Sequence, residues 1–183
     1  TGKHWDANPR IAAFRRAKGF ASNHQLQHYF MNRVREILSR HGRKMIGWDE
    51  IVGPATPAGV TIQAWRGAHA VLAAAQAGHP VIVSSGFYLD WNLPAAHAYG
   101  NRMDGTAADP LDRMERFFAP RIPVMRKMLT EAERKQILGG EACLWSEMIT
   151  ASNIHFRLWP RLGAVAERLW SPAQQNSVED LYS

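Results

Sequence analysis

The segment from residue 60 to residue 85 reads VTIQAWRGAHAVLAAAQAGHPVIVSS, and its pattern decides the fold. It begins with a short apolar run typical of a buried strand, continues into an alanine-rich stretch that favours a helix, and ends with a second apolar run. Gly78 follows the alanine-rich stretch and supplies a helix stop signal. Short apolar strands that alternate with helices predict a parallel sheet and an α/β fold.

Two more predicted strands flank this unit, at residues 44–48 and 137–145. The predicted helices cover residues 23–41, with Asn23 as the N-cap, and residues 68–77, 111–118, 124–135 and 154–170. The Pro, Gly, Asn and Asp content of residues 91–110 predicts a loop.

Aromatic and acidic side chains stand where the four predicted strands end. They are Trp48, Trp65, Tyr88 with Asp90, and Trp145 with Glu147. In a (β/α)8 barrel, the carboxyl ends of the strands build the active site. Four strand–helix units amount to half of such a barrel, so the predicted architecture is half of a TIM barrel, with about four parallel strands and flanking helices.

The composition excludes several classes of protein. A hydrophobic content of 46% and a charged content of 21% are those of a folded globular chain, and no apolar run approaches the ~20 residues that span a bilayer. The net charge of +6 comes from basic residues interleaved with acids, without a nucleic-acid-binding motif. We therefore expect neither a nucleic acid nor a membrane as a partner.

The cysteine and the histidines do not form a pattern typical of a metal or cofactor site. Cys143 is the only cysteine and lies in a small apolar run, which predicts a buried, inert thiol. His24 and His28 are one helical turn apart but lack nearby ligands, so we expect them on a solvated helix face. We expect no metal and no cofactor.

Tryptophan is abundant, with seven residues in the chain. Because an indole offers a large flat apolar face, a surplus of tryptophans suits stacking against a ligand. For Trp5, Trp159 and Trp170 we instead expect a place in the core.

Five motifs carry a resemblance to a known family. They are IGWDE at 46–50, QAW at 63–65, FYLD at 87–90, GGEACLWSE at 139–147 and PRLGAVAERLW at 160–170. Together they resemble successive motifs of glycoside hydrolase family 20, the β-N-acetylhexosaminidases, in the family's order and over nearly the whole chain. The resemblance implies the C-terminal half of the catalytic (β/α)8 barrel, with residues 1–183 as one partial domain that lacks the N-terminal half.

The resemblance also implies roles for the residues at the strand ends. Trp48, Trp65 and Trp145 would line the pocket for a terminal N-acetylhexosamine and its acetamido methyl. Tyr88 would be the catalytic residue in this chain, because it would hydrogen-bond the acetamido oxygen that attacks the anomeric carbon. The structural alternatives are core indoles and an ordinary buried tyrosine.

Two carboxylates complete the implied sugar site. Asp90 and Glu147 would accept hydrogen bonds from sugar hydroxyls, with loop carboxylates or helix caps as the alternative reading. Glu141, inside a predicted strand, is expected to be a buried, paired structural acid, and Arg161, Glu167 and Arg168 are expected to serve the packing of the last helix.

The catalytic acid pair is expected outside this chain. In the family, an Asp-Glu pair ends a Gly-Gly-Asp-Glu motif just upstream of a segment that resembles residues 3–9, so we expect the chain to begin inside a longer protein. The adjacent acids Asp49 and Glu50 follow the predicted strand at residues 44–48. The family has a similar Trp-Asp-Glu there that does not serve as the general acid, so we do not assign them that role.

The sequence thus predicts a fragment of an exo-β-N-acetylhexosaminidase that acts on N-acetylhexosamine-terminated glycans or chitooligosaccharides. We expect the fragment alone to be inactive and to self-associate through its exposed half barrel, and the family resemblance favours a periplasmic or secreted protein. Three alternatives stay open: a non-catalytic carbohydrate-binding module, a basic α/β scaffold for acidic partners, and another barrel glycosidase that uses Asp90 or Glu147 as its acids.

Overall fold

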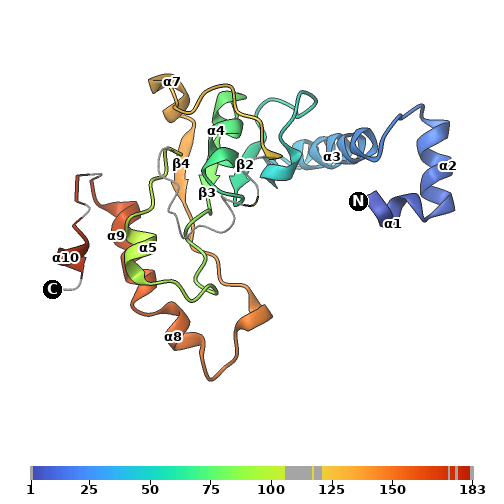
Figure 1. The fold of residues 1–183 in the computed structure, drawn as a ribbon. Helices are drawn as coiled ribbons and strands as arrows, with labels where there is room; N and C mark the ends of the chain where they lie inside the picture. Colours follow the sequence, from blue (N-terminus) through green and yellow to red (C-terminus); the bar gives the residue numbers. More distant parts are fainter. Residues whose placement is uncertain (1, 106–116, 118–120, 173, 176, 182–183) are drawn as a thin grey trace.

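The chain folds around one four-stranded parallel sheet (Figure 1). This computed structural model describes residues 2–105, 117, 121–172, 174–175 and 177–181. The strands are β1 (Ile46–Trp48), β2 (Thr61–Ala64), β3 (Val81–Val83) and β4 (Ile137–Gly140), and they lie side by side in chain order. The predicted α/β class, with four parallel strands and flanking helices, is confirmed.

The register keeps the strand ends level. Ile46 pairs with Thr61, and Ile62 pairs with Val81. Pairing between β3 and β4 continues past the regular strands, because the N–H of Leu89 donates to the carbonyl of Cys143 at 2.7 Å. The segments that leave the last two strands are therefore held together beyond the sheet.

Helix α4 (Ala68–Gln76) packs on β2 and β3 and forms the core with them. Its alanines allow a close approach, and Ile62, Ala64 and Val81 beneath it are completely buried. Full burial of a Val or Ile side chain is worth about 1.5–3 kcal/mol. The βαβ unit that dominates the sequence is thus also the centre of the core.

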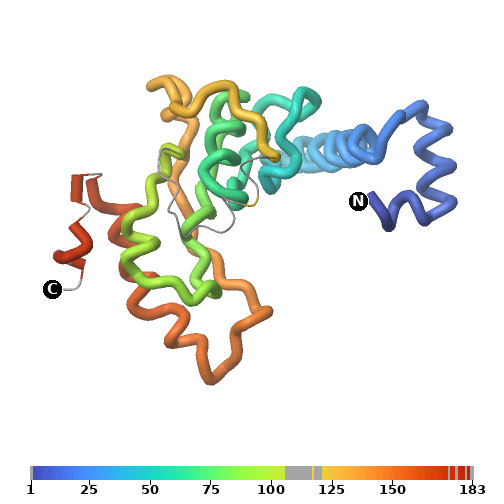
Figure 2. The backbone as a smooth tube through the Cα atoms, in the orientation of Figure 1, coloured from blue at the N-terminus to red at the C-terminus, as the bar shows by residue number. Residues whose placement is uncertain are grey.

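Three helices precede the sheet: α1 (Gly2–Asp6), α2 (Pro9–Ala17) and α3 (Asn23–Arg40). The tube in Figure 2 shows that α3 extends sideways from the sheet and that α1 and α2 lie at its far end. Local capping explains where these helices begin. The Asn8 side chain accepts from the N–H of Arg10 at 3.0 Å, and Ser22 accepts from the N–H of Gln25 at 3.2 Å. The predicted N-cap at Asn23 is wrong by one residue.

The predicted helix over residues 154–170 is two helices, α8 (Ile154–Leu158) and α9 (Arg161–Trp170). Pro160 has no N–H to donate, so the helical ladder breaks between them. Figure 1 shows α9 beside α5 (Ala95–Tyr99), which is a short helix inside the predicted loop over residues 91–110.

Two other helix predictions have different outcomes. Of residues 124–135, only α7 (Glu131–Arg134) is helical, and it begins at a capping box between Thr130 and Glu133. The predicted helix over residues 111–118 lies outside the described residues apart from Phe117. The last helix, α10 (Val178–Leu181), was not predicted.

Some burial predictions are wrong. Trp159 and Trp170, expected in the core, are 58% and 90% exposed. His28, expected on a solvated face, is buried in α3, whereas His24 is exposed. Amphipathic spacing indicates which side chains share a helix face, but it does not show how much of that face other parts of the chain bury.

Gly140 at the end of β4 sits where no side chain fits. A Cβ atom there would lie 2.8 Å from Phe87 Cε2 and 3.0 Å from the carbonyl oxygen of Val83. Gly140→Ala should therefore lower the free energy of unfolding by about 1–3 kcal/mol, because backbone cannot move aside. Gly163→Ala in α9 is the control: its Cβ meets nothing within 4 Å, and alanine should raise stability by about 0.5–1 kcal/mol. Urea denaturation measures both, and equal effects would contradict this packing.

Two buried histidines should make the fold sensitive to acid. Burial lowers the pKa of His28, helped by His24, and burial also lowers the pKa of His79, although a hydrogen bond with Val60 opposes this. The unfolded state then binds more protons, so the stabilisation is present above the ordinary histidine pKa of about 6.5 and is lost as the pH falls below it.

The test compares urea unfolding at about pH 7.5 and about pH 5.5, on either side of the ordinary histidine pKa. We expect the double variant H28Q/H79Q to lose less stability between these two values than the parent. An unchanged loss would show that other groups carry the acid sensitivity.

Candidate functional site

The six residues predicted at the strand ends line one pocket. Its volume is about 430 Å³, within the usual range of small-molecule sites. The predicted lining residues are Trp48, Trp65, Tyr88, Asp90, Trp145 and Glu147, and the remaining ones are Glu50, Trp91 and Met148.

The pocket spans the sheet from its first strand to its last. Trp48 ends β1 and Trp145 follows β4, yet their ring centroids are 6.0 Å apart at an interplanar angle of 43°. The long indole side chains and the segment that leaves β4 thus bring the two lateral edges of the sheet together over the pocket.

Tyr88 offers a hydroxyl that stays protonated. Burial raises its pKa well above the ordinary value, and a hydrogen bond with the Trp145 side chain opposes the rise only in part. Like an ordinary tyrosine, the phenol is a neutral group at physiological pH and can donate a hydrogen bond. Its ring also lies 6.0 Å from the ring of Trp91.

Asp90 is buried and tied to the adjacent strand end. Its Oδ1 accepts from the N–H of Trp145 at 3.2 Å, and its backbone carbonyl accepts from the Arg157 guanidinium at 3.1 Å. These bonds connect the segment after β3 with the segment after β4. The carboxylate therefore has a fixed place in the pocket wall.

Arg161 clamps the loop that follows Asp90. Its guanidinium, 7% exposed, donates to the carbonyl oxygens of Trp91 and Leu93 and, on its other side, to those of Phe156 and Arg157 at 2.8 and 2.7 Å. Five N–H donors in a rigid fork suit such a set of acceptors. The prediction that Arg161 serves the packing of the last helix is confirmed, and the contacts extend that role to the pocket loop.

A polar network lies in the sheet interior next to the pocket. The Glu141 carboxylate accepts from the Gln63 amide, from the Ser84 hydroxyl at 2.8 Å and from the Cys143 thiol at 3.4 Å. Burial, followed by the contact with Glu141, raises the pKa of Cys143 to about 12. The thiol is only half-buried, but it stays protonated. Glu141, expected to be buried within a strand, is half-buried just after β4 and is hydrogen-bonded to neutral groups.

The two acids after β1 have separate surroundings. Asp49 is buried and pairs with the Arg66 guanidinium, while Glu50 lies in the pocket and accepts from the indole N–H of Trp65 at 3.0 Å. Burial raises the pKa of Asp49, and the Arg66 contacts and the N–H of Trp65 oppose that rise.

Sequence reasoning missed Glu50, Trp91 and Met148 as lining residues. Trp91 and Met148 directly follow the predicted residues Asp90 and Glu147, so adjacency along the chain was the available signal. Glu50 lies two residues after Trp48, in the turn η1, and its acidic neighbour Asp49 does not line this pocket.

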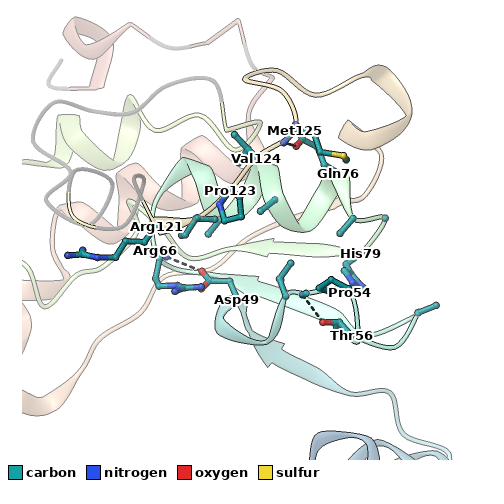
Figure 3. Close-up of a pocket in the computed structure, with 18 residues that line it drawn as sticks. Asp49, Pro54, Thr56, Arg66, Gln76, His79, Arg121, Pro123, Val124 and Met125 are labelled. Atoms are coloured by element: carbon teal, nitrogen blue, oxygen red, sulfur yellow. Dashed lines mark hydrogen bonds and ion pairs between the residues drawn. The ribbon is translucent and has the colours of Figure 1, made fainter. Parts of the chain in front are cut away.

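A second, larger cavity of about 710 Å³ lies beside α4 (Figure 3). It is lined by residues of α4 and of the turn after it, by segments 52–58 and 121–125, and by Asp49 with Arg66; none of the six predicted residues lines it. Gln76 closes one side, because its side chain donates to the carbonyl of Arg126 at 2.6 Å and accepts from the N–H of Met125 at 2.8 Å. The candidate chemistry belongs to the smaller pocket.

No cation site or membrane span is found in the described part of the chain. No group of three or more His, Cys, Asp or Glu side chains there could hold a metal ion. Likewise, no described helix is both long enough and apolar enough to cross a bilayer.

Parallel strands whose ends surround an aromatic, acid-lined pocket have the arrangement of the active site in (β/α)8-barrel enzymes. Residues 1–173 match the glycosyl hydrolase family 20 catalytic domain, and the chain belongs to this family.

The relatives agree with this assignment. The chain is 32% identical to the β-hexosaminidase subunit β of Felis catus over 98% of this chain and 32% of the relative. It is also 32% identical to the β-hexosaminidase of Porphyromonas gingivalis, over 96% of this chain and 22% of the relative. The chain therefore spans about a third or less of the length of these relatives.

The solved structures extend the agreement to the fold. The Flavobacterium johnsoniae chitobiase matches with a TM-score of 0.80 at 33% identity, over 99% of this chain and 26% of that one. A Vibrio harveyi family 20 exo-β-N-acetylglucosaminidase in complex with N-acetylglucosamine matches with a TM-score of 0.74 at 26% identity, over 98% and 28% of the two chains.

The Arg161 clamp can be tested by a substitution that keeps its charge. Arg161→Lys should lower the free energy of unfolding by about 2 kcal/mol, because an ammonium cannot replace the fork that serves carbonyls on both sides. Arg134→Lys, on the exposed face of α7, should change it by less than about 0.5 kcal/mol. Urea denaturation measures the free energy of unfolding of both variants, and equal values would contradict a stabilising role for the Arg161 hydrogen bonds.

Proposed function

We propose that this chain is part of the catalytic domain of an exo-acting β-N-acetylhexosaminidase and forms the sugar-binding wall of its active site. The observation that carries the proposal is the convergence of six side chains from four adjacent strand ends on one pocket. The substrates would be N-acetylhexosamine-terminated glycans or chitooligosaccharides. The binding of N-acetylglucosamine by the Vibrio harveyi relative supports this choice.

The pocket wall suits a pyranose in two ways. Trp48 and Trp145 come from the two outer strands of the sheet and converge at its carboxyl-terminal side. Together with Trp65 they would enclose the acetamido methyl and an apolar sugar face. Asp90 and Glu147 would accept hydrogen bonds from sugar hydroxyls, for which ionised carboxylates are strong acceptors.

Tyr88 would act on the reacting group itself. In substrate-assisted catalysis, the acetamido oxygen attacks the anomeric carbon and takes the place of a protein nucleophile. A neutral phenol can donate to that oxygen and hold it in position. The place of Tyr88 in the pocket lining supports this role.

The general acid and its partner carboxylate would come from residues outside this chain. Within the described residues, β1 pairs only with β2 and β4 only with β3, so the sheet has two open edges at which further strands can add. Residues 1–183 would then form the C-terminal half of the barrel. Without the other half, these edges favour self-association.

Sugar binding is the direct test of the pocket. GlcNAc should change the tryptophan fluorescence of the chain, and Asp90→Asn and Glu147→Gln should each weaken binding by about tenfold, since each loses a charged acceptor. The control Glu131→Gln, at a side chain that is 88% exposed on α7, should leave affinity unchanged. If neither this chain nor a longer product of the same gene responds to GlcNAc, the proposal loses its basis.

Activity separates an enzyme fragment from a binding module. The chain alone should hydrolyse 4-nitrophenyl β-GlcNAc at least about 10²–10⁴-fold more slowly than a longer product of the same gene that carries the acid pair. The gene sequence before the codon for residue 1 should encode a strand ending in Gly-Gly-Asp-Glu. Binding without such a pair would favour a non-catalytic carbohydrate-binding module, whereas full turnover by this chain would place the acid within it.

A further inference from the structure

The adjacent acids Asp49 and Glu50 have no part in the proposed sugar contacts. They form the short turn η1 (Asp49–Ile51), which follows β1 without a break. Asp49 is 2% exposed, whereas Glu50 is exposed in the pocket. Although they face different surroundings, both side chains reach the end of β2, and both bind Trp65.

Asp49 binds the two consecutive backbone N–H groups of Trp65 and Arg66. Its Oδ2 accepts from the N–H of Trp65 at 2.8 Å and from the N–H of Arg66 at 3.1 Å, while its Oδ1 pairs with the Arg66 guanidinium. Figure 3 shows this pair between the segments that follow the two strands. One buried carboxylate therefore fixes the direction in which the chain leaves β2.

Glu50 holds the ring. Its Oε1 accepts from the indole Nε1–H of Trp65 at 3.0 Å. An indole has this single donor, so the hydrogen bond selects one rotation of the ring among those that the backbone permits. With contacts to both its backbone and its ring edge, the orientation of the indole in the pocket is restrained.

We propose that Asp49 and Glu50 are positioning residues that act together on Trp65, Asp49 through its backbone and Glu50 through its indole, so that its flat face is presented to the sugar. The sugar-binding consequence rests on the proposed function, but the hydrogen bonds do not. A preorganised wall binds better than one that must be ordered by the ligand.

A direct contact between Glu50 and the sugar is the competing explanation, because Glu50 also lines the pocket. The two explanations differ in what happens when Trp65 loses its donor. Phenylalanine keeps an aromatic face but has no N–H. If Glu50 acts through Trp65, Glu50→Ala has no further effect in a Trp65→Phe background.

The first arm observes the indole directly and needs no sugar. The seven tryptophans should give seven indole N–H signals in a ¹H–¹⁵N spectrum, and the signal absent from W65F identifies Trp65. In E50A this signal should move upfield, in E50Q it should stay nearer the parent position, and in the exposed control E131A it should not move. A Trp65 signal indifferent to E50A would overturn the proposal.

The second arm measures GlcNAc affinity by fluorescence or calorimetry. We expect E50A to weaken binding roughly threefold to tenfold and E50Q, which keeps an acceptor, to bind within about twofold of the parent. An equal loss on adding E50A to W65F would show direct sugar contact and overturn the positioning role. If neither this chain nor a longer product of the same gene binds GlcNAc, the proposed function fails, while the spectrum still decides whether Glu50 holds the ring.

Asp49 is tested through the backbone. Asp49→Asn loses the ion pair with Arg66 but keeps one amide oxygen, so the Trp65 amide should exchange its hydrogen faster than in the parent, more than amides in α4 do. Equal protection of the Trp65 amide would remove Asp49 from the proposal. The Glu50 variants leave the buried pair intact and do not depend on this substitution.

Discussion

The parallel alignment of the four strands is the constraint on which the pocket depends. Because all four run in one direction and stay level, each releases its chain at the same edge of the sheet. The bridge between Tyr88 and Cys143 extends the last pairing into the segments that carry Asp90 and Trp145. Reversing one strand would send its aromatic side chain to the opposite edge.

Buried charges hold the segments that leave the sheet. Asp49 binds N–H groups at the end of β2, and Arg161 binds carbonyls in the loop after Asp90. Removing charges from water is costly, and replacing buried ion pairs with apolar side chains is often neutral or stabilising. Their presence beside the pocket therefore makes better sense as a means of fixing loop geometry than as a source of stability.

The sequence contains the information for the sheet and most of the pocket, because both follow from local patterns. Apolar runs mark the strands, and the residues at the end of each run must emerge at the shared edge, which was enough to find Trp48 and Trp65. Helix continuity was predicted less well. The apolar face of residues 154–170 continues across Pro160, so periodicity alone joined two helices into one. The exposure of Trp170 likewise depends on which surfaces meet in three dimensions.

Glu50 shows the same limit within the site itself. Its sequence neighbours say that it follows a strand beside another acid, which is compatible with catalysis, with capping or with no role. The decisive fact is a contact 15 residues away along the chain, on the adjacent strand. Spacing cannot supply that contact, because it depends on the register of β1 against β2. Once that register is known, the acid that resembled a proton donor is found bound to the edge of an aromatic ring, and its chemistry becomes that of an acceptor that orients the pocket wall.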